Sequence, residues 1–163
     1  MTFWSNAVEP TRQFRFKVIV GGDTWWWVKS INKPSFTISS NARTVAGTQY
    51  VYPDGAVEWN NITMVMVDTG GQTRKIYDIL RDMGWGPPES GAPGVSKRST
   101  KDAIGDGIME IHQLNSQGEV IEKWKLHNPW LYYVNFGDLN YASDELVSVE
   151  VSIAYDFATM EDI

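Results

Sequence analysis

The chain has 163 residues, of which 42% are hydrophobic, and this predicts a single domain, residues 1–163, with one sizeable core. A formal net charge of −6 argues against a protein that attracts nucleic-acid phosphates with clustered Lys and Arg, and the absence of cysteine excludes disulfides and thiolate metal sites. The sequence has no signal-peptide pattern and no run of ~18 apolar residues, so we expect a soluble protein without membrane contacts.

The first segments of the chain alternate between arm, strand and turn. Residues 1–11 have no hydrophobic period and are predicted to form an arm. From Arg12 to Val20 apolar and polar residues alternate, which is typical of a half-buried strand, and Gly21–Asp23 has the residues of a hairpin turn. Trp25–Trp27 follow in a predicted strand piece. Because neighbouring strand residues point to opposite faces, at least one of these tryptophans is expected on the outer surface.

A long hairpin is predicted over residues 41–68, after a further strand piece at 35–38. Its outgoing strand is Val45–Tyr52, its turn is Pro53–Gly55 and its returning strand is Val57–Val67. Proline fixes φ and Asp-Gly tolerates positive φ, which favours a turn at this place. A hairpin of this length is expected to protrude from the domain, where its bare edges are templates for pairing with another chain.

One amphipathic helix is predicted over residues 72–83. Apolar residues recur at helical spacing from Ile76 to Met83, charged residues take the opposite side, and Gly84 ends the helix. Residues 84–100 are rich in proline and glycine and have no period. We predict a long loop there, of the kind that is usually functional or mobile.

The last third of the chain carries the clearest strand pattern. A hairpin is predicted over Gly107–His127 with its turn at Asn115–Gly118. From Val147 to Phe157 odd-numbered apolar residues alternate with even-numbered small or polar ones, which predicts one strand with its odd-numbered face in the core. The fold class is therefore mainly β: an antiparallel β-sandwich or partial barrel with one flanking α-helix and a long protruding β-hairpin.

Two groups of residues resemble catalytic or metal sites. Asp68-Thr69-Gly70 matches the triplet that aspartic proteases pair, but we interpret Asp68 or Thr69 as the cap of the following helix. His112 and His127 have Glu110 and Glu122 nearby in sequence, yet no metal-binding spacing, so we expect solvent-facing strand residues. Phosphate-binding glycine loops and serine-nucleophile motifs are absent. We therefore predict a protein that is not an enzyme and has no metal and no cofactor.

The order of several segments resembles the tail tube proteins of contractile-tailed bacteriophages. These segments are Phe14–Val18, Lys29–Ser35, the long hairpin, the single helix and the closing Glu150–Phe157. The resemblance implies a structural protein whose hexameric rings stack into a hollow tube that conducts DNA inside a contractile sheath. The implied partners are other copies of the chain, the tail sheath protein, baseplate or tube-initiator proteins and tail terminator proteins. DNA passes without specific binding, and the location is the virion after assembly in the host cytoplasm.

Two alternatives stay open. A baseplate tube-initiator of the same fold would look similar, and eight tryptophans in an acidic β-protein are compatible with a carbohydrate-binding module. For a tube, we expect exposed aromatic residues on protruding elements to make subunit contacts. These candidates are Tyr50, Tyr52, Trp59 and Trp85. Packing of Trp59 inside its own subunit is the alternative for that residue. Residues expected to face an acidic lumen are Glu58, Glu150 and Asp156, with Arg15 and Arg43 as alternative residues of that wall.

Overall fold

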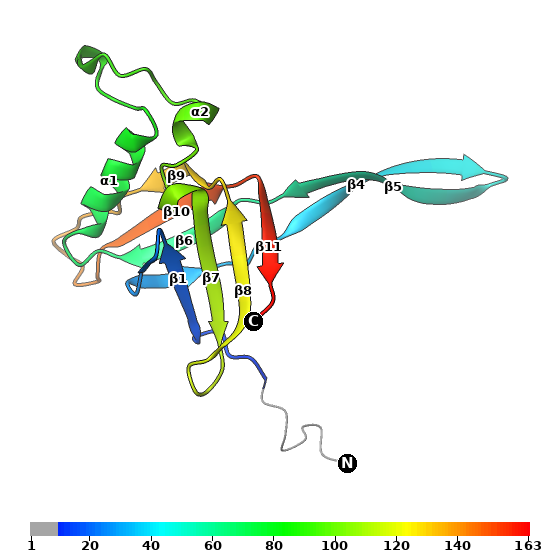
Figure 1. Ribbon diagram of the computed structural model, residues 1–163, viewed down its shortest axis with the longest axis horizontal. Helices are drawn as coiled ribbons and strands as arrows, with labels where there is room; N and C mark the ends of the chain where they lie inside the picture. Colours follow the sequence, from blue (N-terminus) through cyan, green and yellow to red (C-terminus); the bar gives the residue numbers. More distant parts are fainter. Residues whose placement is uncertain (1–9) are drawn as a thin grey trace.

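The computed structural model describes residues 10–163 as two antiparallel sheets that enclose one core, with a hairpin that projects far from them (Figure 1). The strands are β1 (Phe16–Val20), β2 (Asp23–Thr24), β3 (Val28–Ile31), β4 (Phe36–Val45), β5 (Thr48–Trp59), β6 (Ile62–Val67), β7 (Ile108–Leu114), β8 (Val120–His127), β9 (Trp130–Asn135), β10 (Ser148–Ala154) and β11 (Phe157–Glu161). The helices are α1 (Gln72–Asp82) and the short α2 (Lys97–Thr100), with 3-10 turns at η1 (Pro88–Ser90) and η2 (Gly105–Gly107). The predicted fold class is confirmed. Most of the predicted arm, residues 1–9, lies outside the described residues.

The core lies between a five-stranded sheet in the order β11-β8-β7-β1-β2 and a four-stranded sheet in the order β3-β6-β10-β9. Both sheets contribute fully buried apolar side chains to a single cluster, and α1 adds Ile76. The largest of these side chains are Ile62, Met64, Met66, Ile76, Met83, Met109, Leu126 and Ile153. The alternation predicted for the first strand places Val18 and Val20 in this cluster, but β1 begins only at Phe16 and Phe14 is 74% exposed. At least one of the three tryptophans is exposed, as predicted, since Trp26 is exposed while Trp25 is buried. The predicted strand is wrong there, because Trp26 and Trp27 form a turn and β3 begins only at Val28.

The predicted single strand Val147–Phe157 is wrong at its end. β10 stops at Ala154, the chain turns at Asp156, and β11 joins β8 in the other sheet. At this corner Asp156 pairs with Lys97 and accepts a hydrogen bond from Asn128 Nδ2 at 2.8 Å. These contacts hold the pKa of Asp156 below its usual value. The bend shifts the alternation by one residue, so Phe157 is 44% exposed and Ala158 takes the core position.

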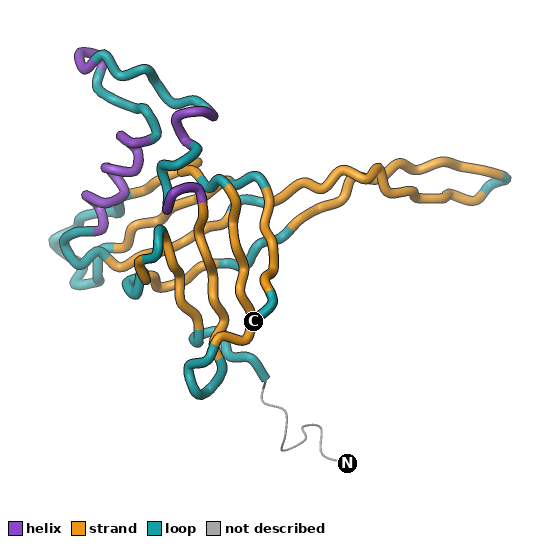
Figure 2. Tube along the Cα trace, in the orientation of Figure 1, coloured by secondary structure: helices purple, strands orange, loops and turns teal. Residues whose placement is uncertain are grey.

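The predicted bounds of the long hairpin are also wrong. The hairpin consists of β4 and β5, and its turn is Ala46-Gly47, where both residues have positive φ of 51° and 81°. Pro53–Gly55 lies inside β5 at a bulge, because Ser40 pairs with Pro53 while Ile38 pairs with Val57. The turn signal of Pro-Asp-Gly is thus used to bend a strand, and β6 belongs to the four-stranded sheet. Figure 2 shows the two hairpin strands running together to the distant tip.

The segment before α1 has a different role from the predicted cap. The N-cap residue is Gly71, without a side-chain hydrogen bond. Asp68 instead accepts hydrogen bonds from the Gly70 N–H at 2.9 Å and from Thr73 Oγ1 at 3.1 Å. Gln72 Oε1 accepts from the Thr69 N–H at 2.7 Å. These bonds shape the approach to the helix, which is a structural use of the aspartate.

The proline- and glycine-rich segment 84–100 is more ordered than the sequence predicts. Its second half contains α2, whose N-cap Ser96 forms a capping box with Ser99. At the start of the segment Gly84 has φ of +107°. A Cβ at this position would lie 2.5 Å from the Gly94 carbonyl oxygen, so the close backbone contact requires glycine. In the described part of the chain no helix is long and apolar enough to cross a membrane.

Ion pairs between the neighbouring strands β8 and β11 predict a pH-dependent stability. Glu161 pairs with Lys123 at 2.8 Å and with Lys125, and these bonds lower the pKa of Glu161 to about 2. Because the folded pKa is below the unfolded one, the pairing stabilises the fold above about pH 4.3 and is lost as the pH falls towards 2. We expect Glu161→Gln to reduce the difference in unfolding temperature between pH 7 and pH 3. An undiminished pH dependence in this variant would contradict the assignment.

Candidate assembly surfaces

The β4–β5 hairpin has two unlike faces. Residues directly opposite on antiparallel strands share a face, so Arg43 and Tyr50 stand together beside Asn41 and Tyr52. Tyr50 and Tyr52 are 48% and 51% exposed. The other face carries small uncharged pairs such as Ala42 with Val51. Figure 1 shows the outer hairpin standing clear of the rest of the described chain. Since an isolated two-stranded hairpin is marginally stable in water, this half of the hairpin needs a partner.

The base of the hairpin is anchored to its own domain. The Trp59 ring lies 5.3 Å from Phe36 and 6.1 Å from Tyr155, measured between ring centroids. Asn60 donates its backbone N–H to the Ser35 carbonyl oxygen at 2.9 Å and its Nδ2 to Ser35 Oγ at 3.0 Å. These contacts set the direction in which the hairpin leaves the body, and they favour the alternative that Trp59 packs inside its own subunit.

Replacing Trp59 is therefore expected to act on stability. Trp59→Ala removes a partly buried ring that packs against the core cluster. Full burial would make the loss ~3–5 kcal/mol, and we expect about 2 kcal/mol because part of the ring is exposed. Tyr52→Ala is the matched control on the same strand and is expected to leave the free energy of unfolding nearly unchanged. Denaturant unfolding of both variants measures this, and equal stabilities would contradict the packing role.

The residues predicted to face a lumen lie on separate elements. Glu150 is exposed on β10, where its neighbours in the sheet are Val65 and Asn135. Glu58 is exposed near the base of the hairpin, opposite Thr37. Asp156 lies at the corner after β10, so the expectation that it shares a strand face with Glu150 is wrong. Its charge is paired with Lys97, and Glu150 is the candidate that lies on a sheet face.

Strand β9 carries a candidate contact surface that was not predicted from the sequence. It forms one edge of the four-stranded sheet, and β3 forms the other. Tyr132 is an extra residue between the pairs of Leu131 and Tyr133 with β10, and this bulge leaves Tyr132 and Tyr133 exposed. The run of aromatic and β-branched residues at 130–134 was the available signal. An edge that carries two exposed tyrosines is suited to contact with another chain.

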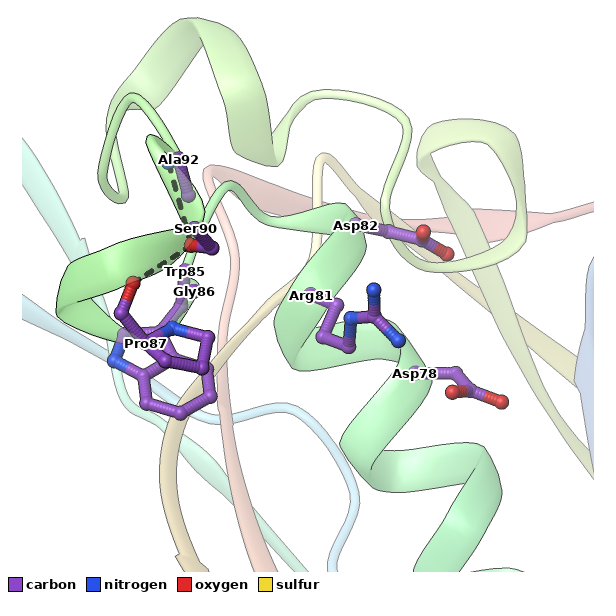
Figure 3. Close-up of a pocket in the computed structure, with 8 residues that line it drawn as sticks. All are labelled: Asp78, Arg81, Asp82, Trp85, Gly86, Pro87, Ser90 and Ala92. Atoms are coloured by element: carbon purple, nitrogen blue, oxygen red, sulfur yellow. Dashed lines mark hydrogen bonds between the residues drawn. The ribbon is translucent and has the colours of Figure 1, made fainter.

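Trp85 lines a shallow cleft between α1 and the segment that follows it (Figure 3). Its ring stands edge-on to Tyr77 at 6.0 Å between centroids. Asp78 and Arg81 line the cleft from the helix, and Ser90 Oγ donates to the Pro87 carbonyl oxygen at 2.7 Å. The cleft contains no pairing of a nucleophile with a base. Trp85 remains a candidate for subunit contact.

The two histidines do not form a site together. His112 is buried, against the prediction, and its Nε2 lies 2.9 Å from Glu110 Oε2. His127 stacks on Phe157 at 4.3 Å between ring centroids, and its Nε2 lies 3.0 Å from Thr159 Oγ1. The described residues hold no group of three or more potential metal ligands.

Comparison of the fold with solved structures identifies a consistent group. A chain in the cryo-EM structure of the extracellular contractile injection system PVC, sheath/tube terminator in the extended state, is 18% identical with a TM-score of 0.73, covering 95% of this chain and 99% of that chain. A chain in the PVC sheath-tube complex is 18% identical with a TM-score of 0.71, covering 94% and 93%. A chain in the 6-fold symmetrised baseplate of the anti-feeding prophage is 15% identical with a TM-score of 0.67, covering 94% and 97%.

Sequence comparison alone finds no such group, because neither a protein-family model nor a curated protein matches the chain. At these low identities the likeness concerns the fold. It extends over nearly the whole of both chains. The resemblance predicted from sequence is thereby confirmed at the level of structure: this chain has the fold of the tube and terminator proteins of contractile injection systems.

Proposed function

We propose that this protein is a structural tube component of a contractile injection system, whose copies form hexameric rings that stack into a hollow tube. The observation that carries the proposal is the β4–β5 hairpin, which leaves a body of this fold and presents Tyr50 and Tyr52 exposed in the described part of the chain. Closed rings also cover the sheet edges that β3 and β9 leave bare in a single copy. The protein acts by assembling and not by catalysis.

The partners follow from this role. The similar chains come from structures described as a sheath/tube terminator, a sheath-tube complex and a baseplate. We infer the same neighbours here: further copies of the chain, a sheath around the tube, and baseplate and terminator proteins at its ends. A ring at one end of the tube is the second candidate, and the terminator similarity favours it. Such a terminal protein forms single rings, whereas a tube protein stacks them without limit.

The channel conducts cargo without binding it. The sequence resemblance points to a phage tail particle, in which that cargo is DNA. Glu150 is proposed to face the channel, because it lies on the side of β10 opposite the core residues Val149 and Val151. Repeated around a ring, this carboxylate makes a negative band that repels a polyanion and prevents it from sticking. Nothing in the comparisons favours the carbohydrate-binding alternative.

The position of Glu150 is tested by labelling, since the chain has no cysteine of its own. In assembled tubes of Glu150→Cys, a small maleimide is expected to react, while a maleimide attached to a folded protein is excluded from the channel. Glu161→Cys, on the edge strand of the other sheet, is the control. Equal reaction of Glu150→Cys with both reagents in tubes would place this residue outside.

The function itself is tested by the mass of the purified protein in solution. Light scattering over a range of concentrations is expected to find particles of six times the 18.5 kDa chain mass and multiples of that unit. Rings that never exceed one such unit would indicate the terminal role. A monomer at every concentration, also with the baseplate present, would refute the proposal.

A further inference from the structure

The loop between β9 and β10, residues 136–147, exposes an unusual combination of side chains. Leu139 is 89% exposed, Tyr141 is fully exposed and Leu146 is also exposed. The same loop carries Asp138, Asp144 and Glu145 and contains no Lys or Arg. Large apolar groups on a soluble surface, accompanied by charges of one sign, are typical of a contact surface for a partner with the opposite charge. We call residues 136–147 the acidic loop.

Hydrogen bonds between asparagine side chains and backbone N–H groups hold the acidic loop in shape. Asn135 Oδ1 accepts from the Gly137 N–H at 2.9 Å, and Asn140 Oδ1 accepts from the Ala142 N–H at 2.9 Å. Gly137 has φ of +96°, and a Cβ there would lie 2.7 Å from the Ser148 carbonyl oxygen. Among the described residues the loop's three carboxylates have no ion-pair partner. A preformed loop loses little conformational entropy on docking, and its charges are available to another chain.

A cleft of complementary character lies beside β3. It is lined by the apolar side chains of Phe14, Phe16, Ile31 and Ile111, and by Lys29 and Lys33, with no acidic residue among its lining. Phe14 is 74% exposed. Lys33 is paired with Glu122 at 2.9 Å, whereas Lys29 has no ion pair in the described part of the chain. We call this the basic cleft.

The acidic loop and the basic cleft are built from different strands of the body. The loop follows β9, the strand at one edge of the four-stranded sheet, and the cleft includes Lys29–Ile31 of β3, the strand at the other edge. The loop returns to β10 and lines a hollow together with Val65 of β6, whereas the cleft extends to Phe16 of β1 and Ile111 of β7, and no residue lines both. Because no residue of the loop lines the cleft of its own chain, the cleft is available to the loop of a second copy.

We propose that the acidic loop of one copy docks into the basic cleft of a second copy, with its apolar side chains against Phe14 and its carboxylates near Lys29. Because the two surfaces differ, the contact is head-to-tail, and each copy both offers a loop and receives one. Such a contact closes a ring when the rotation between copies divides a full turn. The inference rests on the proposed function, since its partner is this chain itself.

Charge reversal gives the decisive test. Lys29→Glu alone and the pair Asp144→Lys with Glu145→Lys alone each bring like charges together, and each is expected to reduce the assembled fraction at low salt at least about ten-fold. A mixture of the two variants is expected to restore assembly. In an alternating ring, every contact joins either a native loop to a native cleft or a reversed loop to a reversed cleft. Native gel electrophoresis and light scattering measure the assembled fraction.

The outcomes separate the two proposals. If wild-type protein assembles but the mixture stays unassembled, or if either variant assembles alone as well as wild type, the loop–cleft contact is wrong and the tube function stands. If wild-type protein never forms rings, both proposals fall. Circular dichroism of each variant establishes that it is folded, and restoration on mixing is a result that misfolded variants do not give.

Cross-linking supplies a second measurement at a place where charge plays no part. A chain carrying Phe14→Cys and Leu139→Cys is expected to give a ladder of covalent oligomers on oxidation, because each copy is joined to the next. The matched control replaces Phe14→Cys by Met160→Cys, which is exposed on the edge strand of the other sheet. This control pair is expected to stop at dimers. Ladders of equal length from both pairs, or from neither, would overturn the proposed contact.

Discussion

Shortening the β4–β5 hairpin is expected to abolish tube formation while leaving the body of the protein folded. Ser40 and Pro53 are paired directly across the two strands, so residues 41–52 can be replaced by an Asn-Gly turn that joins them. None of the removed residues belongs to the buried core cluster. The shortened chain is therefore expected to unfold within about 0.5 kcal/mol of wild type, as surface changes usually do.

The reason for the large effect is that no other described segment of the chain covers the outer hairpin. Its exposed tyrosines and the apolar face around Val51 are the surfaces that we propose to be buried in an assembly. Electron microscopy and light scattering of the shortened chain measure its assembly. A control with the full hairpin and Thr44→Ser should assemble as wild type does. Stacked rings formed by the shortened chain would contradict the assigned role of the hairpin.

The second large effect concerns the core strand β10. Ile153 is 2% exposed and pairs with Ile62 on β6 and with Leu131 on β9, so its side chain fills the centre of the sandwich. Ile153→Ala is expected to cost about 2–4 kcal/mol, from the lost burial and from the cavity that remains. Because the whole domain depends on this core, the variant is also expected to lose assembly at temperatures where wild type assembles.

A matched control on another strand separates this effect from a general loss of β propensity. Ile121 lies on β8 and is 44% exposed. Ile121→Ala is expected to change the free energy of unfolding by less than about 1 kcal/mol, because little apolar surface is lost to water. Denaturant unfolding measures both variants. Similar losses of unfolding free energy in the two variants would contradict the burial of Ile153 in the core.

The sequence predicts the strands of this fold better than their ends. Alternation places Val149, Val151 and Ile153 in the core, because a pattern of period two is imposed by burial of one face. It does not reveal that the chain passes into the other sheet at Asp156. Strands in both sheets show the same alternation of apolar and polar residues. After the corner the buried position is taken by Ala158, and alanine is too small and too weakly hydrophobic to reveal the one-residue shift in the sequence.

The hairpin shows why turn signals alone are insufficient. Pro53-Asp54-Gly55 has better turn chemistry than Ala46-Gly47, yet the structure turns at the latter and bends a strand at the former. Both features need a residue that tolerates positive φ, so local propensity does not distinguish a bulge from a turn. The choice depends on which strands pair over the full length of the ribbon.

The candidate surfaces were predictable to different degrees. Tyr50 and Tyr52 are exposed on the hairpin because no other strand among the described residues covers them. Trp59 is only nine residues from Tyr50 in sequence, but it lies at the point where the hairpin meets the core and packs against Tyr155. The basic cleft brings together residues that are far apart in the sequence, such as Phe14, Lys29 and Ile111. Spacing along the chain contains no information about it.

End-on views of the purified assembly by cryo-electron microscopy test the central claim most directly. The expected result is a ring of six copies around an open channel, with the sheets of neighbouring copies side by side and the hairpins reaching from each copy onto its neighbours. Side views are expected to show these rings stacked into a straight tube. Particles without a channel, or monomers at every concentration even with the baseplate present, would contradict the account.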